Sequence, residues 1–118
     1  MTLPPALAAF ALTGRRAVVT GGNAGIGEAM ATALGRAGAS LLLVARRATE
    51  LEAAANRLRA LGVACDTLVA DLGRTPNLPA IGAAIAARGN TDILVNAAGV
   101  NLRQPFGEVT PEAWDQQL

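Results

Sequence analysis

A glycine-rich stretch between an apolar run and a helix-permissive run is the part of the sequence best suited to chemistry. It reads Thr-Gly-Gly-Asn-Ala-Gly-Ile-Gly and covers residues 20–27. Gly21 would allow a sharp turn out of a strand, Gly25 a close approach of the main chain to a phosphate, and Gly27 tight packing of a helix on that strand. The free N–H groups and the positive dipole end of the helix would then attract an anion.

The kind of anion follows from what comes after the glycines. No Gly-Lys-Ser/Thr sequence follows the turn, so a dinucleotide fits better than a nucleoside triphosphate. A glycine-rich loop that binds nothing is the alternative, and the three glycines by themselves leave it open. Asn23, inside the turn, would add a hydrogen bond to a ribose or a phosphate of a bound dinucleotide.

The residues after the second apolar run indicate which dinucleotide is preferred. An acid at this position hydrogen-bonds the adenosine ribose and favours NAD, whereas an arginine accommodates the 2′-phosphate of NADP. Here the run ends in Arg46 and Arg47, with no acid, and a guanidinium binds phosphate through charge-assisted hydrogen bonds. Arg46 is the first choice for this role and Arg47 the second. The alternative is that both are solvated arginines near a helix start.

Two further short segments lie where the third and fourth strands are expected to end. Asp71 and Leu72 follow the third strand, and a carboxylate at such a place often only caps a loop. Residues 96–99 follow the fourth strand and read Asn-Ala-Ala-Gly. Small side chains here would let a flat ligand lie against the backbone, and an ordinary turn is the alternative.

Strands and helices alternate along the chain in a way that would bring these segments together. The expected strands cover residues 16–20, 40–45, 63–70 and 92–95. The expected helices cover residues 25–36 and 49–61, a third whose start is bracketed by Pro76 and Pro79 and which runs to about residue 88, and a last one that starts at residue 110. This alternation predicts an α/β fold with a Rossmann-like, doubly wound parallel sheet in strand order 3-2-1-4. The third strand is less apolar and suits a sheet edge, and Thr49 with Glu52 would form a capping box at the start of the second helix.

The composition limits the class of protein. The 118 residues allow a single domain over 1–118, and 52% hydrophobic with 16% charged residues can build a core. A net charge of +1 gives no reason to expect nucleic acid or a membrane surface as a partner, and no apolar run is long enough to span a bilayer. Cys65 is the single cysteine and is expected to be a buried small hydrophobe in a reducing cytoplasm. Without histidine, a zinc or transition-metal site has almost no ligands available.

The three motifs together resemble the classical short-chain dehydrogenase/reductase family. The glycine pattern TGxxxGxG, the Asp-Leu pair and the Asn-Ala-Ala-Gly segment occur in that family's order and spacing, over essentially the whole chain. By this resemblance Asp71 would contact the adenine amino group and Leu72 would pack against the ring. Asn96 would steady the central strands, and residues 97–99 would lie beside the nicotinamide-side ribose. The family usually has Asn-Asn-Ala-Gly, from which Ala97 departs.

The resemblance implies a cofactor and a set of binding residues. The cofactor would be NADP(H), with NAD possible, and the preference depends on Arg46 alone because Ala24, not a basic residue, precedes Gly25. The expected cofactor-binding residues are Thr20, Gly21, Asn23, Gly25, Ile26, Gly27, Arg46, Arg47, Asp71, Leu72, Asn96, Ala97, Ala98 and Gly99.

The residues that perform catalysis in this family are absent from the sequence. The family exchanges a hydride between the cofactor and a ketone, aldehyde or alcohol with a Tyr-x-x-x-Lys pair, a Ser and an Asn, and this chain has no Tyr and no Lys. Residues 110–118 look like the segment just before the catalytic Asn. The resemblance therefore implies the N-terminal, cofactor-binding part of an oxidoreductase, inactive alone and a homo-oligomer, tetramer or dimer, in its full-length form. A non-catalytic dinucleotide-binding module and a degenerate fragment are the alternatives.

Three smaller expectations concern the end of the chain. The loop over residues 100–106 resembles that of enzymes acting on sugar acids such as gluconate, while Phe106 and Trp114 are expected to pack in a core. A sheet that stops after the fourth strand would leave an apolar parallel strand without a neighbour. We therefore expect the isolated chain to be poorly soluble or to dimerise through that edge.

Overall fold

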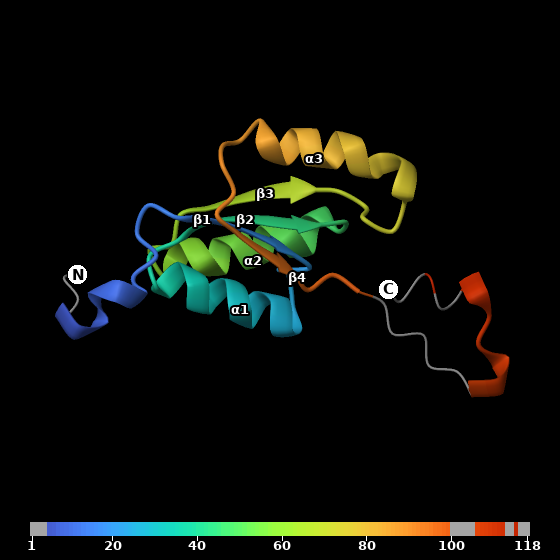
Figure 1. The fold of residues 1–118 in the computed structure, drawn as a ribbon, viewed down its shortest axis with the longest axis horizontal. Helices are drawn as coiled ribbons and strands as arrows, with labels where there is room; N and C mark the ends of the chain where they lie inside the picture. Colours follow the sequence, from blue (N-terminus) through green and yellow to red (C-terminus); the bar gives the residue numbers. More distant parts are fainter. Residues whose placement is uncertain (1–4, 100–105, 113–114, 116–118) are drawn as a thin grey trace.

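A computed structural model describes residues 5–99, 106–112 and 115 of the chain. In these residues four strands form one parallel sheet in the order β3-β2-β1-β4 (Figure 1). The strands are β1 (Arg16–Thr20), β2 (Ser40–Ala45), β3 (Cys65–Val69) and β4 (Ile93–Asn96). The predicted Rossmann-like α/β fold and its strand order 3-2-1-4 are confirmed.

Helices lie on both faces of the sheet. α1 (Gly25–Arg36) and α2 (Ala48–Ala60) cover one face and α3 (Leu78–Ala86) covers the other, as Figure 1 shows. Short 3₁₀ helices precede β1 (η1, Pro5–Phe10), lead into α3 (η2, Thr75–Asn77) and follow β4 (η3, Phe106–Glu108). Among the described residues, no helix is long and apolar enough to cross a membrane. Nor do these residues bring together three His, Cys, Asp or Glu side chains that would hold a metal ion.

The two central strands carry the core. Residues 17–20 of β1 and 41–44 of β2 are buried, because helices pack against both faces of these strands. The larger apolar cluster lies between the sheet and helices α1 and α2. A smaller cluster, built on Val18, Leu42 and Val44, lies on the other face with α3. The core is therefore much thicker on one side of the sheet than on the other.

The element bounds differ little from those predicted. They agree in full for β1, α1 and β2 and within one residue for α2, while β3 is shorter than 63–70 and β4 lies one residue later than 92–95. The third helix begins at Leu78, between the two prolines predicted to bracket its start, and ends at Ala86, two residues before its predicted end. Pro111 and Glu112 are helical, as expected of a helix that starts at residue 110. Residues 100–105, Trp114 and the Phe106 side chain lie outside the description.

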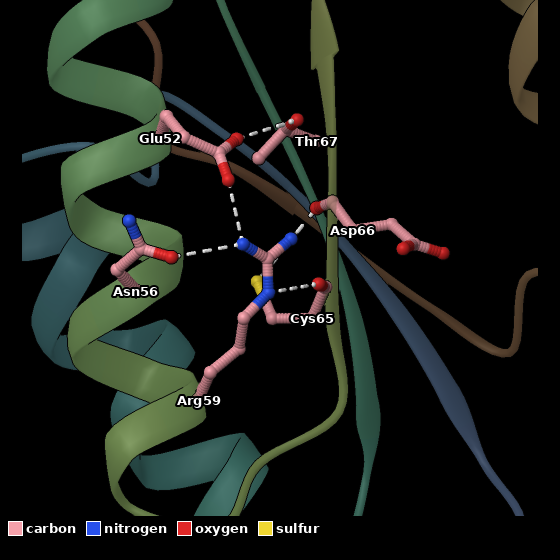
Figure 2. Close-up of polar contacts among 6 residues, drawn as sticks. All are labelled: Glu52, Asn56, Arg59, Cys65, Asp66 and Thr67. Carbon is pink, nitrogen blue, oxygen red and sulfur yellow. Dashed lines mark hydrogen bonds and ion pairs between the residues drawn. The ribbon is translucent and has the colours of Figure 1, made fainter.

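The capping box predicted at the start of α2 is wrong. Arg47, not Thr49, is the capping residue, and no side chain bonds the first amides of the helix. The Glu52 carboxylate instead accepts hydrogen bonds from Arg59 (2.6 Å) and from Thr67 (3.3 Å) on β3 (Figure 2). These two tertiary partners, one of them a cation, hold the carboxylate away from the start of the helix.

Cys65 begins β3 and is buried, as predicted. Burial raises the pKa of its thiol to about 11, so the thiol stays protonated near neutral pH. A protonated, buried thiol is a poor nucleophile. The residue therefore acts as a small core side chain.

Candidate functional site

The segments that carry the predicted site meet at one edge of the sheet. All four strands run parallel, so their carboxyl ends lie side by side. The glycine turn follows β1, the two arginines follow β2, Asp71 follows β3, and residues 97–99 follow β4. Open α/β sheets bind their ligands at this edge, in the crevice where the strand order reverses. In this sheet the reversal lies between β1 and β4.

Gly21 is required by both its backbone conformation and its surroundings. Its φ is 69°, in the left-handed region that favours glycine, and its N–H donates to the Val44 carbonyl at 2.8 Å. A Cβ at this position would lie only 2.7 Å from the backbone nitrogen of Ala98. The turn after β1 therefore packs directly against the loop after β4.

The two later glycines of the motif serve different purposes. Gly27 is buried, and a Cβ there would collide with the carbonyl oxygen of Gly21. Gly25 has a φ of 57°, and nothing lies within 4 Å of the place a Cβ would take. Its surroundings leave the backbone at the start of α1 accessible. No side chain caps that helix start, so its first N–H groups face an open surface that suits an anion.

Thr20 holds the turn and the fourth strand together. Its hydroxyl donates to the Val95 carbonyl (3.3 Å) and accepts from the Ala98 N–H (3.4 Å). Its own carbonyl accepts from the Ala97 N–H at 3.1 Å. Thr20 is 6% exposed, so these contacts are shielded from water. The residue thereby sets the position of the Asn-Ala-Ala-Gly segment relative to the glycine turn.

Several predicted residues offer exposed surface at this edge. Ile26 is 78% exposed in the first turn of α1, which is unusual for so apolar a side chain. Asn96, Ala98 and Gly99 are also exposed, while Ala97 is half-buried. Ile26 and residues 97–99 thus place apolar or small groups near the glycine turn, which suits a flat ring or a ribose.

The two arginines after β2 differ in their partners. Arg46 makes no ion pair or side-chain hydrogen bond with any residue that the structure describes. Arg47 pairs with Glu50, with Nη1 3.4 Å from Oε1. Asn23 donates its amide to the other oxygen of the same carboxylate at 3.5 Å. The structure thus brings Asn23 and Arg47 together through Glu50, a residue that sequence reasoning missed although its spacing of three from Arg47 was visible.

Arg46 and Asp71 line the same hollow. An open cavity of about 470 Å³ lies between the end of β3 and α3. Its lining residues are Arg46, Leu68, Val69, Ala70, Asp71, Asn77, Ala80, Ile81 and Ala84. The contribution of α3 was not predicted, because its apolar side chains carry no motif. Leu72 is half-buried and does not line the hollow.

The Asp71 carboxylate has local partners. One oxygen accepts from the Gly73 N–H at 2.9 Å, and the other lies 3.5 Å from Arg74. The residue therefore caps its loop, the alternative role that the sequence left open for it. Such capping also fixes the direction of the carboxylate at the rim of the hollow, and an exposed ion pair of this kind is weak enough to be exchanged for a ligand.

A comparison with family models shows to which family the chain belongs. The family model for short chain dehydrogenases matches residues 15–118, which contain every segment described above. The chain belongs to the short-chain dehydrogenase family. The glycine turn, the arginines after β2 and the loop after β4 thus all lie within the matched region of a short-chain dehydrogenase chain.

Individual relatives agree with this assignment. Gluconate 5-dehydrogenase of Gluconobacter oxydans is 36% identical over 110 residues, which cover 92% of this chain and 43% of that protein. The structure of a 3-oxoacyl (acyl-carrier-protein) reductase from Agrobacterium tumefaciens with NADP bound has a TM-score of 0.84 at 31% identity, covering 92% of this chain and 42% of the other. L-sorbose reductase of Gluconobacter frateurii, complexed with NADPH and L-sorbose, has a TM-score of 0.79 at 32% identity, with 90% and 41% covered. This short-chain dehydrogenase chain spans less than half the length of these relatives.

Proposed function

We propose that this chain binds NADP(H) and is the cofactor-binding part of an oxidoreductase that interconverts a ketone or aldehyde and an alcohol. The observation that carries the proposal is the cradle at the start of α1, where Gly25 leaves the backbone open and Gly21 and Gly27 have no room for a Cβ. A pyrophosphate fits such a cradle because the uncapped N–H groups of the helix point at it.

Each predicted residue has a role in this proposal. The backbone of the glycine turn holds the pyrophosphate, Arg46 binds the 2′-phosphate, and Asp71 with Leu72 borders the adenine. Ile26 and residues 96–99 form the surface on which the nicotinamide half rests. The bound cofactor supplies or accepts a hydride, and this chain's residues bind and orient it. NAD is a weaker ligand in this scheme because it has no phosphate for Arg46 to contact.

The names of two relatives and one loop of this chain support a proposed substrate class. Gluconate 5-dehydrogenase and L-sorbose reductase are named for a sugar acid and a sugar, and residues 100–106 resemble the loop of enzymes that act on sugar acids. We therefore propose a sugar or sugar acid such as gluconate as the substrate. The catalytic Tyr and Lys would be supplied by sequence other than these 118 residues, which contain neither.

The setting of the protein is part of the proposal. Residues 1–118 form one NAD(P)-binding domain, the complete enzyme is a dimer or tetramer, and it works in the cytoplasm. Its partners are the dinucleotide and a small carbonyl or alcohol compound, without nucleic acid or membrane. The second candidate is a non-catalytic dinucleotide-binding module, which the absence of Tyr and Lys from the sequence favours.

Titration of the purified chain with NADPH and with NADH, followed by cofactor fluorescence, tests the proposal. We expect saturable binding that favours NADPH, with no turnover of gluconate or other sugar acids. Arg46→Asp should weaken NADPH binding about tenfold or more and leave NADH nearly unchanged, because only NADPH carries the phosphate.

Arg88→Asp is the matched control, since it makes the same charge change beyond the end of α3. The next residue, Gly89, contacts Arg16 at the amino end of β1, so Arg88 lies far from the carboxyl ends of the strands. Equal losses for both cofactors in Arg46→Asp would reject Arg46 as the phosphate-binding residue. A folded wild-type chain that binds neither cofactor would reject the proposed function. Turnover by the chain alone would reject the proposal that other sequence supplies the catalytic residues.

A further inference from the structure

The Glu50 carboxylate lies where a negative charge opposes the binding of a phosphate. Glu50 belongs to the first turn of α2, three residues after Arg47. One of its oxygens is 3.4 Å from Arg47 and the other is 3.5 Å from the Asn23 amide. It therefore joins the loop after β1 to the loop after β2, the two loops between which a 2′-phosphate would sit.

The ion pair with Arg47 has little to do with folding. Its side chains are 64% and 53% exposed, and exposed pairs at a spacing of three contribute little to stability because water screens them. The Asn23 contact is at the long end of the hydrogen-bond range. Glu50 changes the charge near the loops, because it places a carboxylate beside Arg47, whereas Arg46 has no carboxylate partner among the residues that the structure describes.

The two cofactors respond differently to such an arrangement. The 2′-phosphate of NADP(H) is repelled by the Glu50 carboxylate and must compete with it for Arg47 and Asn23. NAD(H) has a ribose hydroxyl in place of the phosphate and meets neither cost. A carboxylate at this position therefore reduces the preference for NADP(H) over NAD(H) that Arg46 produces.

We propose that Glu50 is a specificity-determining residue that limits the discrimination between NADP(H) and NAD(H) by holding Arg47 and Asn23 in a carboxylate bridge. This inference rests on the proposed function, because it needs the cofactor to bind beside these loops. It assigns different parts to the two arginines: Arg46 binds the phosphate, and Arg47 is the partner for which Glu50 and the phosphate compete.

Glu50→Gln in the complete 118-residue chain tests the inference, because it keeps the shape and removes the charge. We expect the variant to bind NADPH about threefold to tenfold more tightly and NADH within about twofold of the wild type. Calorimetry with two smaller probes should give the same pattern. Glu50→Gln should bind 2′,5′-ADP more tightly than the wild type does and should bind 5′-AMP with little change, since only 2′,5′-ADP carries a 2′-phosphate.

Glu52→Gln is the matched control. It removes the same charge from the same helix, but its carboxylate faces β3 and Arg59, so it should leave the ratio of the two affinities unchanged. Thermal unfolding by circular dichroism reports whether each variant is folded.

The outcomes separate the two proposals. If the wild type binds NADPH and Glu50→Gln changes both cofactors equally, or weakens NADPH, the inference is wrong while the proposed function stands. Equal gains in Glu50→Gln and Glu52→Gln would also overturn it, because net charge alone would explain them. A folded wild type that binds none of the four ligands would overturn the proposed function and this inference with it.

Discussion

The two outer strands of the sheet, β3 and β4, are finished in different ways. Along β3, the Arg59 guanidinium reaches over from α2 and donates Nε to the Cys65 carbonyl at 3.0 Å (Figure 2). The same side chain binds Glu52 at 2.6 Å and Asn56 at 3.1 Å, and Thr67 donates to Glu52. A backbone acceptor of the outer strand is thus covered by a charged network, which is one way in which proteins prevent sheet edges from pairing.

The β4 edge has no such cover among the described residues. Leu94 is 59% exposed, although its register partner Val18 on β1 is fully buried. Ile85 of α3 packs against the cluster that contains Val18, and Leu94 does not belong to that cluster. The β3 edge is thus protected because the neighbouring helix α2 supplies a long charged side chain. The β4 edge stays open to pairing because no described helix supplies such a side chain.

The largest effect is expected from adding a charge to the open edge. The wild-type chain should self-associate or aggregate through β4, and Leu94→Lys should raise the dissociation constant of the self-associated form at least about tenfold, because a charged lysine on an edge strand discourages pairing with another strand. Sedimentation velocity over a concentration series measures this. Leu61→Lys, at an exposed leucine after α2, is the control and should change nothing. A wild-type chain that is monomeric at every concentration would contradict the prediction.

A smaller effect is expected from uncovering the protected edge. Arg59→Met keeps the apolar stem but removes the donors to Cys65, Glu52 and Asn56, so the midpoint of thermal unfolding should fall by a few degrees and aggregation should increase. Arg57→Met is the control, because Arg57 makes an equally short ion pair, with Glu28 on α1, but bonds no strand backbone. If Arg59→Met and Arg57→Met lower the midpoint of thermal unfolding and increase aggregation equally, the contact of Arg59 with β3 does not protect the edge.

The smallest effect is expected from pH. The hydrogen bond from Arg59 holds the pKa of the Glu52 carboxyl below its ordinary value. The folded chain therefore loses this proton more readily than the unfolded chain, and the resulting stability is present above the ordinary pKa and lost as pH falls through the lowered one. The thermal midpoint of the wild type should exceed that of Glu52→Gln near neutral pH, and the two midpoints should converge as the pH falls below the lowered pKa of Glu52. Curves that stay apart at the lowest pH would show that the pair does not depend on this charge.

Local sequence patterns predicted most of the fold and a smaller part of the candidate site. The apolar runs of β1 and β2 and the glycines around them are periodic signals, so their bounds were predicted in full. The predicted capping box is wrong because Glu52 binds Thr67 on β3, and no residue close to Glu52 in the sequence indicates this contact. The bridge from Asn23 to Glu50 spans 27 positions and the contact of Thr20 with Ala98 spans 78. Such contacts depend on how the elements pack, which spacing along the chain does not encode.

The uneven core has a consequence for motion. α3 buries only Ile81 among its described residues, so separating this helix from the sheet costs far less than opening the α1 and α2 side. We therefore expect the slowest amide exchange at the centre of the molecule and the earliest local opening at α3. The hollow beside Arg46 is walled partly by this helix. A nucleotide that filled this hollow would contact α3, the helix with the fewest buried residues. Binding of the nucleotide would therefore also reduce the motion of α3.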